Sequence, residues 1–344
     1  MFRSFQRSDD PVSVAQRVFS LPTLVSLAVA AAFLVFLVVR FDVDLSATWQ
    51  QVKSSNPWIL ALALMVHYTI FIFRGARWRL LLQNTQSRER PRPSIRYCNE
   101  LTLLGWFANS VAGFRLGDAY RAYLYHNEQG ASFSRTVGTV LSERVLDTAL
   151  VVALLVISVP FLVGRETGPS WTVVAVALSL LAILALALLA IARLREKLLR
   201  WLPAWLAERY QRFCEGVLGS FRQMPLVTLL GLLGWLSEVG RLYLVTLALG
   251  IDLSFPLIIF ITLANSLLTL VPTPGGIGAV ESGVAGLLVR LSALSTSGAA
   301  ALVLVDRSIS YVSIIVSGAT VFFARQAFRR RALVSKSSTA VEPQ

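Results

Sequence analysis

Eleven charged residues stand inside long apolar stretches of this 344-residue chain. An ionisable group at membrane depth costs about 2.5–3.5 kcal/mol even on lenient insertion scales, so each needs a stabilising partner. Arginine binds phosphate through two parallel hydrogen bonds, and a nearby carboxylate orients the arginine or carries a proton. The set predicts either a polar binding site or buried ion pairs that fix helix packing. The basic members are Arg115, Arg121, Arg144, Arg241 and Arg307, and the acidic members are Asp118, Glu143, Asp147, Glu238, Glu281 and Asp306.

Two polar stretches of the chain resemble one another. An Ala-Asn-Ser triplet begins at Ala108 and again at Ala264, 156 residues later. Two further pairs are each separated by 163 residues: Asp118 with Glu281, and Arg144 with Arg307. One seven-residue insertion within the second copy explains both spacings. The pattern predicts an internal repeat that carries polar groups at membrane depth, which is typical of transporters.

A proline- and glycine-rich turn, Pro-Thr-Pro-Gly-Gly-Ile-Gly at residues 272–278, follows the second triplet. Prolines end the incoming helix, and Gly275, Gly276 and Gly278 permit unusual backbone angles. The next helix begins with unpaired N–H groups, which attract anions. No nucleotide-binding loop is indicated, because no strand precedes the turn and no Lys-Ser/Thr pair follows it.

The composition is that of a polytopic membrane protein. The chain is 55% hydrophobic with a mean hydropathy of +0.65, and its charges cluster between apolar runs. We expect one membrane domain at 22–325, with a cytoplasmic N-terminal segment at 1–21 and a cytoplasmic basic tail at 326–344. Basic loops account for the net charge of +13, so no nucleic-acid partner is expected. The sequence shows no catalytic, metal or cofactor motif, so no catalytic residue, metal or cofactor is predicted.

The predicted fold is all-α, a membrane helix bundle of about six full spans and two re-entrant helical hairpins. About 20 apolar residues cross the hydrocarbon core. The hairpins, at about 95–127 and 255–291, are interrupted by polar turns, and each half is too short to cross alone. The predicted spans are 22–39, 57–73, 136–163, 171–192, 225–249 and 297–323.

The distribution of basic residues predicts the orientation. Residues 74–97 contain seven arginines and one acidic residue, and residues 193–222 are also basic. Basic loops stay in the cytoplasm, which places both termini there, in a bacterial-type inner (plasma) membrane. Three spans separate the hairpins, so the two copies are an inverted repeat. The segment at 193–222 is either an interfacial amphipathic helix or a solvated basic loop.

The predicted site residues fall into two groups. The charge partners are Asp118, Glu143, Asp147, Glu238, Arg241, Glu281 and Asp306. The residues expected to bind an anionic headgroup are Arg115, Arg121, Arg144, Arg307, Gly275, Gly276 and Gly278.

Four motifs follow one another along the chain: Arg77-Trp78-Arg79-Leu80-Leu81, Arg115-Leu116-Gly117-Asp118 with Arg121, Glu143-Arg144 with Asp147, and Pro274-Gly275-Gly276-Ile277-Gly278 with Glu281. Together they resemble those of the lysylphosphatidylglycerol synthase transmembrane-region family of flippase-like proteins. The first hairpin departs from the usual pattern, with Gly113-Phe114 in place of a proline-containing turn. The resemblance implies a membrane domain with paired re-entrant helices that moves lipids between leaflets. The synthase domain is absent from this sequence, so aminoacyl transfer is not implied.

The function expected from the sequence is transport of a lipid with a phosphate-containing headgroup, either a phospholipid or a polyprenyl-phosphate-linked lipid. The partners would be membrane lipids and a lipid-modifying enzyme acting on the same lipid. Two alternatives remain open at this stage. One is a membrane glycosyltransferase that uses a polyprenyl-phosphate sugar, and the other is a non-catalytic scaffold whose buried charges hold helices together.

Overall fold

The computed structural model describes residues 44–85, 92–111, 116–162, 171–269, 271 and 273–339. This part of the chain contains helices and turns and no strand, which confirms the all-α class. Five helical segments within it are long and apolar enough to cross a membrane: Pro57–Thr85, Phe133–Phe161, Leu178–Trp201, Met224–Ala248 and Thr296–Phe328. The sixth predicted span, at 22–39, and the segment 1–21 lie outside the described residues.

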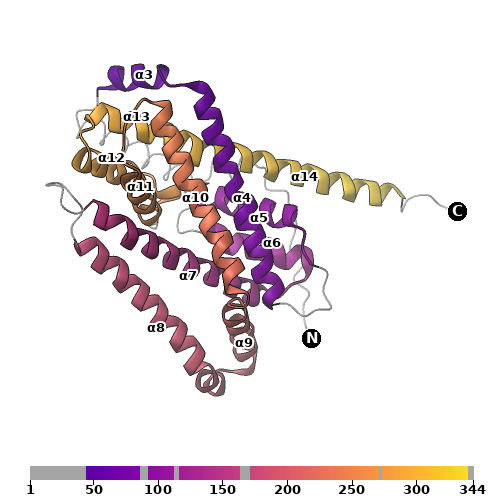
Figure 1. Ribbon diagram of the computed structural model, residues 1–344. Helices are drawn as coiled ribbons and strands as arrows, with labels where there is room; N and C mark the ends of the chain where they lie inside the picture. Colours follow the sequence, from indigo (N-terminus) through magenta and orange to yellow (C-terminus); the bar gives the residue numbers. More distant parts are fainter. Residues whose placement is uncertain are drawn as a thin grey trace.

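The helices follow one another with short connections (Figure 1). A 3₁₀ turn at Val159–Phe161 extends α7, and a π-helical turn at Ser308–Val312 joins α13 to α14. In chain order they are α3 (Leu45–Lys53), α4 (Pro57–Thr85), α5 (Ile95–Val111), α6 (Leu116–Gln129), α7 (Phe133–Ser158), α8 (Trp171–Trp201), α9 (Ala204–Gly219), α10 (Met224–Ala248), α11 (Phe255–Leu268), α12 (Ala279–Leu291), α13 (Thr296–Arg307) and α14 (Ser313–Thr339).

Helices α4 and α10 pack side by side along most of their length (Figure 1). Glycines on α10 leave room for the long side chains of α4. A Cβ atom at Gly231 would lie 2.7 Å from Nη1 of Arg77, and one at Gly234 would lie 3.8 Å from Cγ of Arg74. Small residues at helix crossings are typical of membrane bundles. Here they allow two arginines to lie between two long apolar helices.

Two pairs of short helices pack against this central pair. Helices α5 and α6 form one pair, and α11 and α12 form the other. Their lengths are 17, 14, 14 and 13 residues. At about 1.5 Å per residue, even the longest falls short of the ~30 Å hydrocarbon core. In the first pair the backbones are very close, because a Cβ at Gly117 would lie 1.9 Å from the carbonyl oxygen of Gly105.

The two helix pairs open toward opposite ends of the bundle. Near the C-terminal end of α4, Arg79 Nε donates to the Pro93 carbonyl, at 2.8 Å, just before α5 begins. At the other end, Asn56 N donates to the Ala248 carbonyl, at 2.9 Å, between α10 and α11. The turn that joins α11 to α12 therefore points back toward the middle of the bundle. The turn of the first pair, at 112–115, lies outside the described residues.

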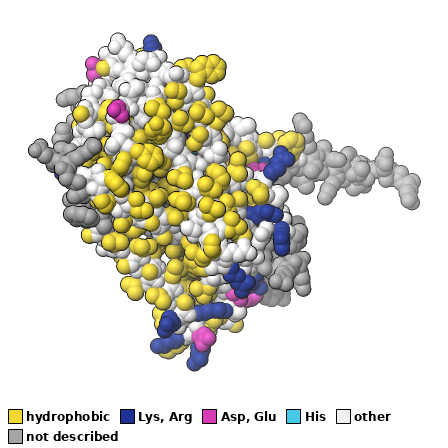
Figure 2. Space-filling model, in the orientation of Figure 1, with side chains coloured by type: hydrophobic (Ala, Val, Ile, Leu, Met, Phe, Trp, Pro, Cys, Tyr) yellow, Lys and Arg dark blue, Asp and Glu magenta, His cyan; other side chains and the backbone are white. Residues whose placement is uncertain are grey.

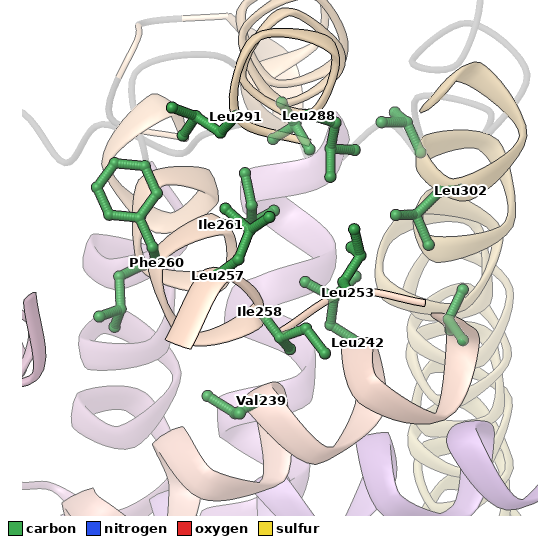
Figure 3. Packing of buried hydrophobic residues seen from close by; sticks show 14 of the residues in the cluster. Val239, Leu242, Leu253, Leu257, Ile258, Phe260, Ile261, Leu288, Leu291 and Leu302 are labelled. Atoms are coloured by element: carbon green, nitrogen blue, oxygen red, sulfur yellow. The ribbon is translucent and has the colours of Figure 1, made fainter. Parts of the chain in front are cut away.

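The largest buried apolar cluster surrounds the second helix pair. Figure 3 shows side chains of α10, α11, α12 and α13 meeting there, among them Leu242, Ile258, Leu288 and Leu302. Outside, apolar side chains cover the broad middle of the face in Figure 2, and Lys and Arg gather at its lower and right margins. A wide apolar surface bordered by charge is what a membrane-embedded bundle presents.

The basic segment at 193–222 forms two helical pieces. Its first part is the end of α8, and its second part is α9, which packs against α7. That packing is tight, because a Cβ at Gly216 would lie 2.1 Å from the Arg135 carbonyl oxygen. Trp201 and Trp205 are exposed beside the junction, and the Arg209 guanidinium lies 5.5 Å from the Trp205 ring centroid.

Candidate functional site

A network of buried ion pairs connects α4, α6 and α7. Arg77 on α4 reaches two carboxylates of α7, with Nη2 3.0 Å from Glu143 Oε1 and Nη1 2.8 Å from Asp147 Oδ1. Arg74 Nη1 lies 2.8 Å from the second Asp147 oxygen. Arg121 on α6 lies 2.6 Å from the second Glu143 oxygen. Glu143 is therefore shared between two arginines, and Asp147 between three, since Arg144 Nη1 lies 4.0 Å from it. This sharing compensates the removal of each carboxylate from water.

A smaller network connects α10 and α13. Arg241 forms an ion pair with Asp306 and, at 2.9 Å, a second one with Glu238. Arg77 and Glu143 are 66 residues apart, and Arg241 and Asp306 are 65 apart. The same kind of contact thus recurs at almost the same spacing in the two halves of the chain.

The two halves differ at neighbouring positions. The first half has Arg74 three residues before Arg77, whereas the second has Glu238 three residues before Arg241. Asp147 lies three residues after Arg144, whereas Ser310 lies three residues after Arg307. The Ser310 hydroxyl is buried and makes no hydrogen bond to the described residues. The contact pattern repeats, but its charge does not.

A second pair of matching contacts involves Arg144 and Arg307. Arg144 donates from Nε and Nη2 to both oxygens of Asp118, at 2.9 and 2.6 Å. Arg307 donates from Nε to Glu281, at 2.7 Å, and from Nη2 to the Gly275 carbonyl, at 2.9 Å. In both cases arginine and carboxylate are 26 residues apart.

The side chains of Arg144 and Arg307 are more exposed than those of the arginines in the two buried networks. The side chains of Arg144 and Arg307 are 29% and 12% exposed. Those of Arg77, Arg121 and Arg241 are 1%, 3% and 2% exposed. Arg121 also lies over the Trp78 ring, 4.4 Å from its centroid. Accessibility therefore separates arginines enclosed by the bundle from those that a small molecule can reach.

The glycine turn holds Arg307 and contacts the first helix pair. Gly275, Gly276 and Gly278 have φ values of 58°, 72° and 91°, which favour glycine. A Cβ at Gly275 would lie 2.1 Å from the Tyr311 ring, which is stacked on Arg307 at 4.5 Å. Tyr311 donates to the Ser110 carbonyl, at 2.8 Å, near the end of α5. The ends of the two helix pairs thus meet through one tyrosine.

The N-terminus of α12 already has an anionic partner within the chain. Glu281 Oε2 accepts a hydrogen bond from Gly278 N, at 2.6 Å, as a capping carboxylate does. This carboxylate also pairs with Arg307. The backbone of the turn therefore offers Arg307 a carbonyl, and the turn contributes to the site by orienting that arginine.

A cavity of about 220 Å³ lies where the helix pairs meet. Both Asn-Ser pairs of the repeated triplet line it, together with arginines and aromatic side chains from α4, α5, α7, α10 and α13–α14. The Arg74 guanidinium lies between two of these rings, 5.3 Å from the Trp106 centroid and 5.5 Å from that of Trp235. The lining includes Arg74, Trp106, Asn109, Ser110, Arg144, Asp147, Trp235, Glu238, Arg241, Asn265, Ser266, Gly275, Arg307, Ser310 and Tyr311.

The predicted site residues divide between the cavity and its support. Arg115 lies outside the described residues. Those that line the cavity are Arg144, Arg307, Gly275, Asp147, Glu238 and Arg241. Those that lie behind the lining and contact it or each other are Arg121, Asp118, Glu143, Glu281, Asp306, Gly276 and Gly278.

Three residues of the site and its support, Arg74, Arg77 and Tyr311, were not predicted from the sequence. Both arginines fall in the basic stretch 74–97, which was expected to be a loop, but α4 continues to Thr85 and buries them. Their spacing of three residues, on one helix face, was the available signal. Tyr311 lies in the π-helical turn directly after Arg307. π-Helical turns occur often at functional sites, but no pattern of residues in the sequence predicts this one.

Comparison with known proteins identifies the family. The family model "Lysylphosphatidylglycerol synthase TM region" matches residues 23–318. The chain belongs to this family. This assignment confirms the resemblance seen in the sequence. It also confirms the prediction that the protein crosses the membrane several times. Its motifs from Arg77 to Glu281 fall inside the matched range.

Curated relatives of this family member are also membrane proteins. A UPF0104 membrane protein of Methanocaldococcus jannaschii is 32% identical over 226 residues, which cover 63% of this chain and 93% of the relative. A UPF0104 membrane protein of Methanothermobacter thermautotrophicus is 28% identical over 286 residues, 76% of this chain and 81% of the relative. A further one from that organism is 25% identical over 340 residues, 88% of this chain and 94% of the relative.

Proposed function

We propose that this protein moves a lipid with a phosphate-containing headgroup between the two leaflets of the membrane. The observation that carries the proposal is the cavity into which Arg144 and Arg307 are presented from the two halves of the chain. Each guanidinium is anchored through Nε and Nη2. Nη1 of each makes no hydrogen bond to the described residues, although in Arg144 it lies 4.0 Å from Asp147 Oδ2. In the proposal this nitrogen donates to a phosphate oxygen, and charge-assisted bonds of this kind are strong.

The enclosed arginines have a supporting role in this proposal. Arg77, Arg121 and Arg241 have carboxylate partners and almost no exposed surface. Arg77 and Arg121 hold Glu143 and Asp147 on α7, and Arg241 holds Asp306 on α13. Rigid support of this kind places the reachable groups accurately, which binding sites require. We therefore assign headgroup binding to Arg144 and Arg307 and helix positioning to the other three.

The arrangement of the helix pairs supports alternating access. We propose that α5–α6 and α11–α12 are re-entrant hairpins that enter the membrane from opposite sides, since each helix is short and the pairs open toward opposite ends. The matched contacts at spacings of 26 residues are those expected of an inverted repeat. In this proposal both termini are cytoplasmic, the membrane is the plasma membrane, and an enzyme that modifies the same lipid acts beside the protein.

Transport in proteoliposomes tests the proposal. Purified protein is reconstituted with a fluorescent anionic phospholipid, and transfer between leaflets is followed by reduction of the outer dye with dithionite. We expect Arg144→Ala and Arg307→Ala each to slow transfer by about tenfold or more, because a lost charge-assisted hydrogen bond is worth roughly 1.5–3 kcal/mol. Arg209→Ala, on the exposed face of α9, is the matched control and should leave the rate unchanged. Full transfer by both cavity variants would contradict the proposal.

A further inference from the structure

Most hydroxyl groups of the cavity wall have fixed hydrogen-bonding directions, the exception being Ser310, which makes no hydrogen bond to the described residues. Five of them donate to backbone carbonyls: Ser110 to Trp106, Thr148 to Arg144, Thr262 to Ile258, Ser266 to Leu263 and Thr273 to Ile277, at 2.8–3.0 Å. A hydroxyl has one hydrogen and two lone pairs. With the hydrogen already used, each of these oxygens serves a ligand as an acceptor.

One further acceptor lies beside these hydroxyls. The Asn265 Oδ1 atom lines the same cavity, is buried and accepts no hydrogen bond from the described residues. A buried polar atom without a partner is costly, so a ligand that donates to it gains affinity. The same wall also includes two buried donors without a partner among the described residues, Trp235 Nε1 and the Ser310 hydroxyl. The neutral part of the wall is therefore suited to hydroxyl groups, which both donate and accept hydrogen bonds.

The charge and the size of the cavity restrict that group. Four arginines line it, against two carboxylates, Asp147 and Glu238. Three of these arginines also pair with carboxylates behind the wall, Asp118, Glu281 and Asp306, so the site as a whole has no positive excess. The guanidinium groups of Arg144 and Arg307 line the cavity itself, where they favour a phosphate and disfavour an ammonium group beside it. The volume of about 220 Å³ is below the roughly 300–1,000 Å³ of typical small-molecule sites. It accommodates a headgroup and leaves the lipid chains outside.

We infer that the headgroup is an uncharged polyol or sugar joined to the lipid through phosphate. The phosphate pairs with Arg144 and Arg307, and the ligand hydroxyls donate to the oxygens of Ser110, Thr148 and Thr262. This inference deepens the proposed function and rests on it. It names the part of the headgroup beyond the phosphate, which the arginines alone do not specify.

A series of lipids with matched chains tests the inference. Phosphatidylinositol and phosphatidylglycerol carry hydroxyls, phosphatidic acid carries phosphate alone, and phosphatidylethanolamine carries an ammonium group. We expect the first two to be transported at least fivefold faster than the last two, since each hydrogen bond contributes a factor of roughly two to ten. Equal transport of phosphatidic acid and phosphatidylinositol would overturn the inference.

Variants assign the preference to the cavity wall. Thr148→Val and Thr262→Val remove a hydroxyl and keep the side-chain size, so the preference for phosphatidylinositol over phosphatidic acid should fall by about threefold or more. Ser179→Ala is the matched control, because its hydroxyl makes the same kind of bond to Ala175, at 2.8 Å, on the exposed face of α8. An unchanged preference in both threonine variants would count against the wall oxygens.

Binding in detergent separates this inference from the proposed function. Thermal unfolding is measured with each lipid in mixed micelles and with soluble inositol phosphate and glycerol phosphate. Selective stabilisation by the hydroxyl-bearing lipids, without transport in proteoliposomes, would uphold the inference and overturn the proposed function. Transport of lipids with no preference for hydroxyl-bearing headgroups would uphold the proposed function and overturn the inference. Equal stabilisation by the soluble phosphates would identify a free phosphate ester as the ligand and overturn the lipid assignment.

Discussion

A single buried carboxylate can connect several helices of this protein. Glu143 receives Arg77 on one oxygen and Arg121 on the other, and so joins α4 and α6 to α7. Its side chain is 3% exposed, so water cannot replace either arginine. Loss of one member of a buried network leaves the remaining charges uncompensated, which is costlier than the loss of a surface pair.

Neutralising Glu143 should therefore destabilise the fold. We expect Glu143→Gln to lower the free energy of unfolding by about 3–5 kcal/mol, the range for a broken buried pair. Thermal unfolding of detergent-purified protein, followed by intrinsic fluorescence, measures the change. Glu208→Gln is the control, because Glu208 pairs with Arg212 on α9 and its side chain is 65% exposed. An unfolding temperature equal to that of the wild type would show that the Glu143 network does not stabilise the fold.

At the residue scale, the sequence predicted which charged residues lie at membrane depth, but not which of them form ion pairs with one another. The acidic residues Glu143 and Asp147 are four apart, which predicts one shared helix face. Which arginines face them depends on the contact between α4 and α7, and no local pattern encodes that contact. Arg74 and Arg77 follow an apolar run directly, so they read equally well as the first residues of a basic loop.

At the scale of elements, glycines at helix crossings set the distances between helices. Gly216 on α9 faces the backbone of α7, where a Cβ would lie 2.1 Å from the Arg135 carbonyl oxygen. A backbone atom cannot swing aside as a side-chain end can. Close packing of α9 on α7 thus depends on the missing side chain.

Adding one methyl group tests this packing. We expect Gly216→Ala to destabilise the protein by about 1–3 kcal/mol, the usual effect of overpacking. Gly286→Ala is the matched control inside α12, because a Cβ there has no neighbour within 4 Å. It should be neutral or stabilise by about 0.5–1 kcal/mol through helix propensity. The unfolding temperatures of the two variants are compared with that of the wild type. Equal changes in both variants would contradict the role of Gly216 in packing.

At the scale of the whole molecule, opposite orientation of the helix pairs makes a topological prediction. Cys98 and Cys214 are buried, so new cysteines can be labelled against the native background. We expect a membrane-impermeant maleimide to label Ala293→Cys, just after α12, in intact cells. Gln129→Cys, at the end of α6, should react only after permeabilisation. Both positions are exposed in the structure. Labelling of both in intact cells would rule out hairpins that enter from opposite sides.

Hydropathy predicted the long helices of the bundle well, because an apolar run of about 20 residues has few alternatives in a membrane. The cavity could not be predicted in the same way. In it Tyr311 links Arg307 to the Ser110 carbonyl, and two Asn-Ser pairs that are far apart in the sequence line one wall. The triplets indicated equivalent positions in a repeat, whereas their meeting in space depends on how the two halves pack.

Under the proposed function, the charge difference between the halves has a consequence for the resting state of the empty carrier. Two identical halves that exchange shapes pass between states of equal energy, and such a carrier rests equally on either side. Here the first half has Arg74 and Asp147 where the second has Glu238 and Ser310. When the two halves exchange conformations, the charged residues of each half therefore enter surroundings that the different charges of the other half had occupied. If the protein is the carrier proposed above, its two resting states differ in energy, and the empty carrier has a preferred side.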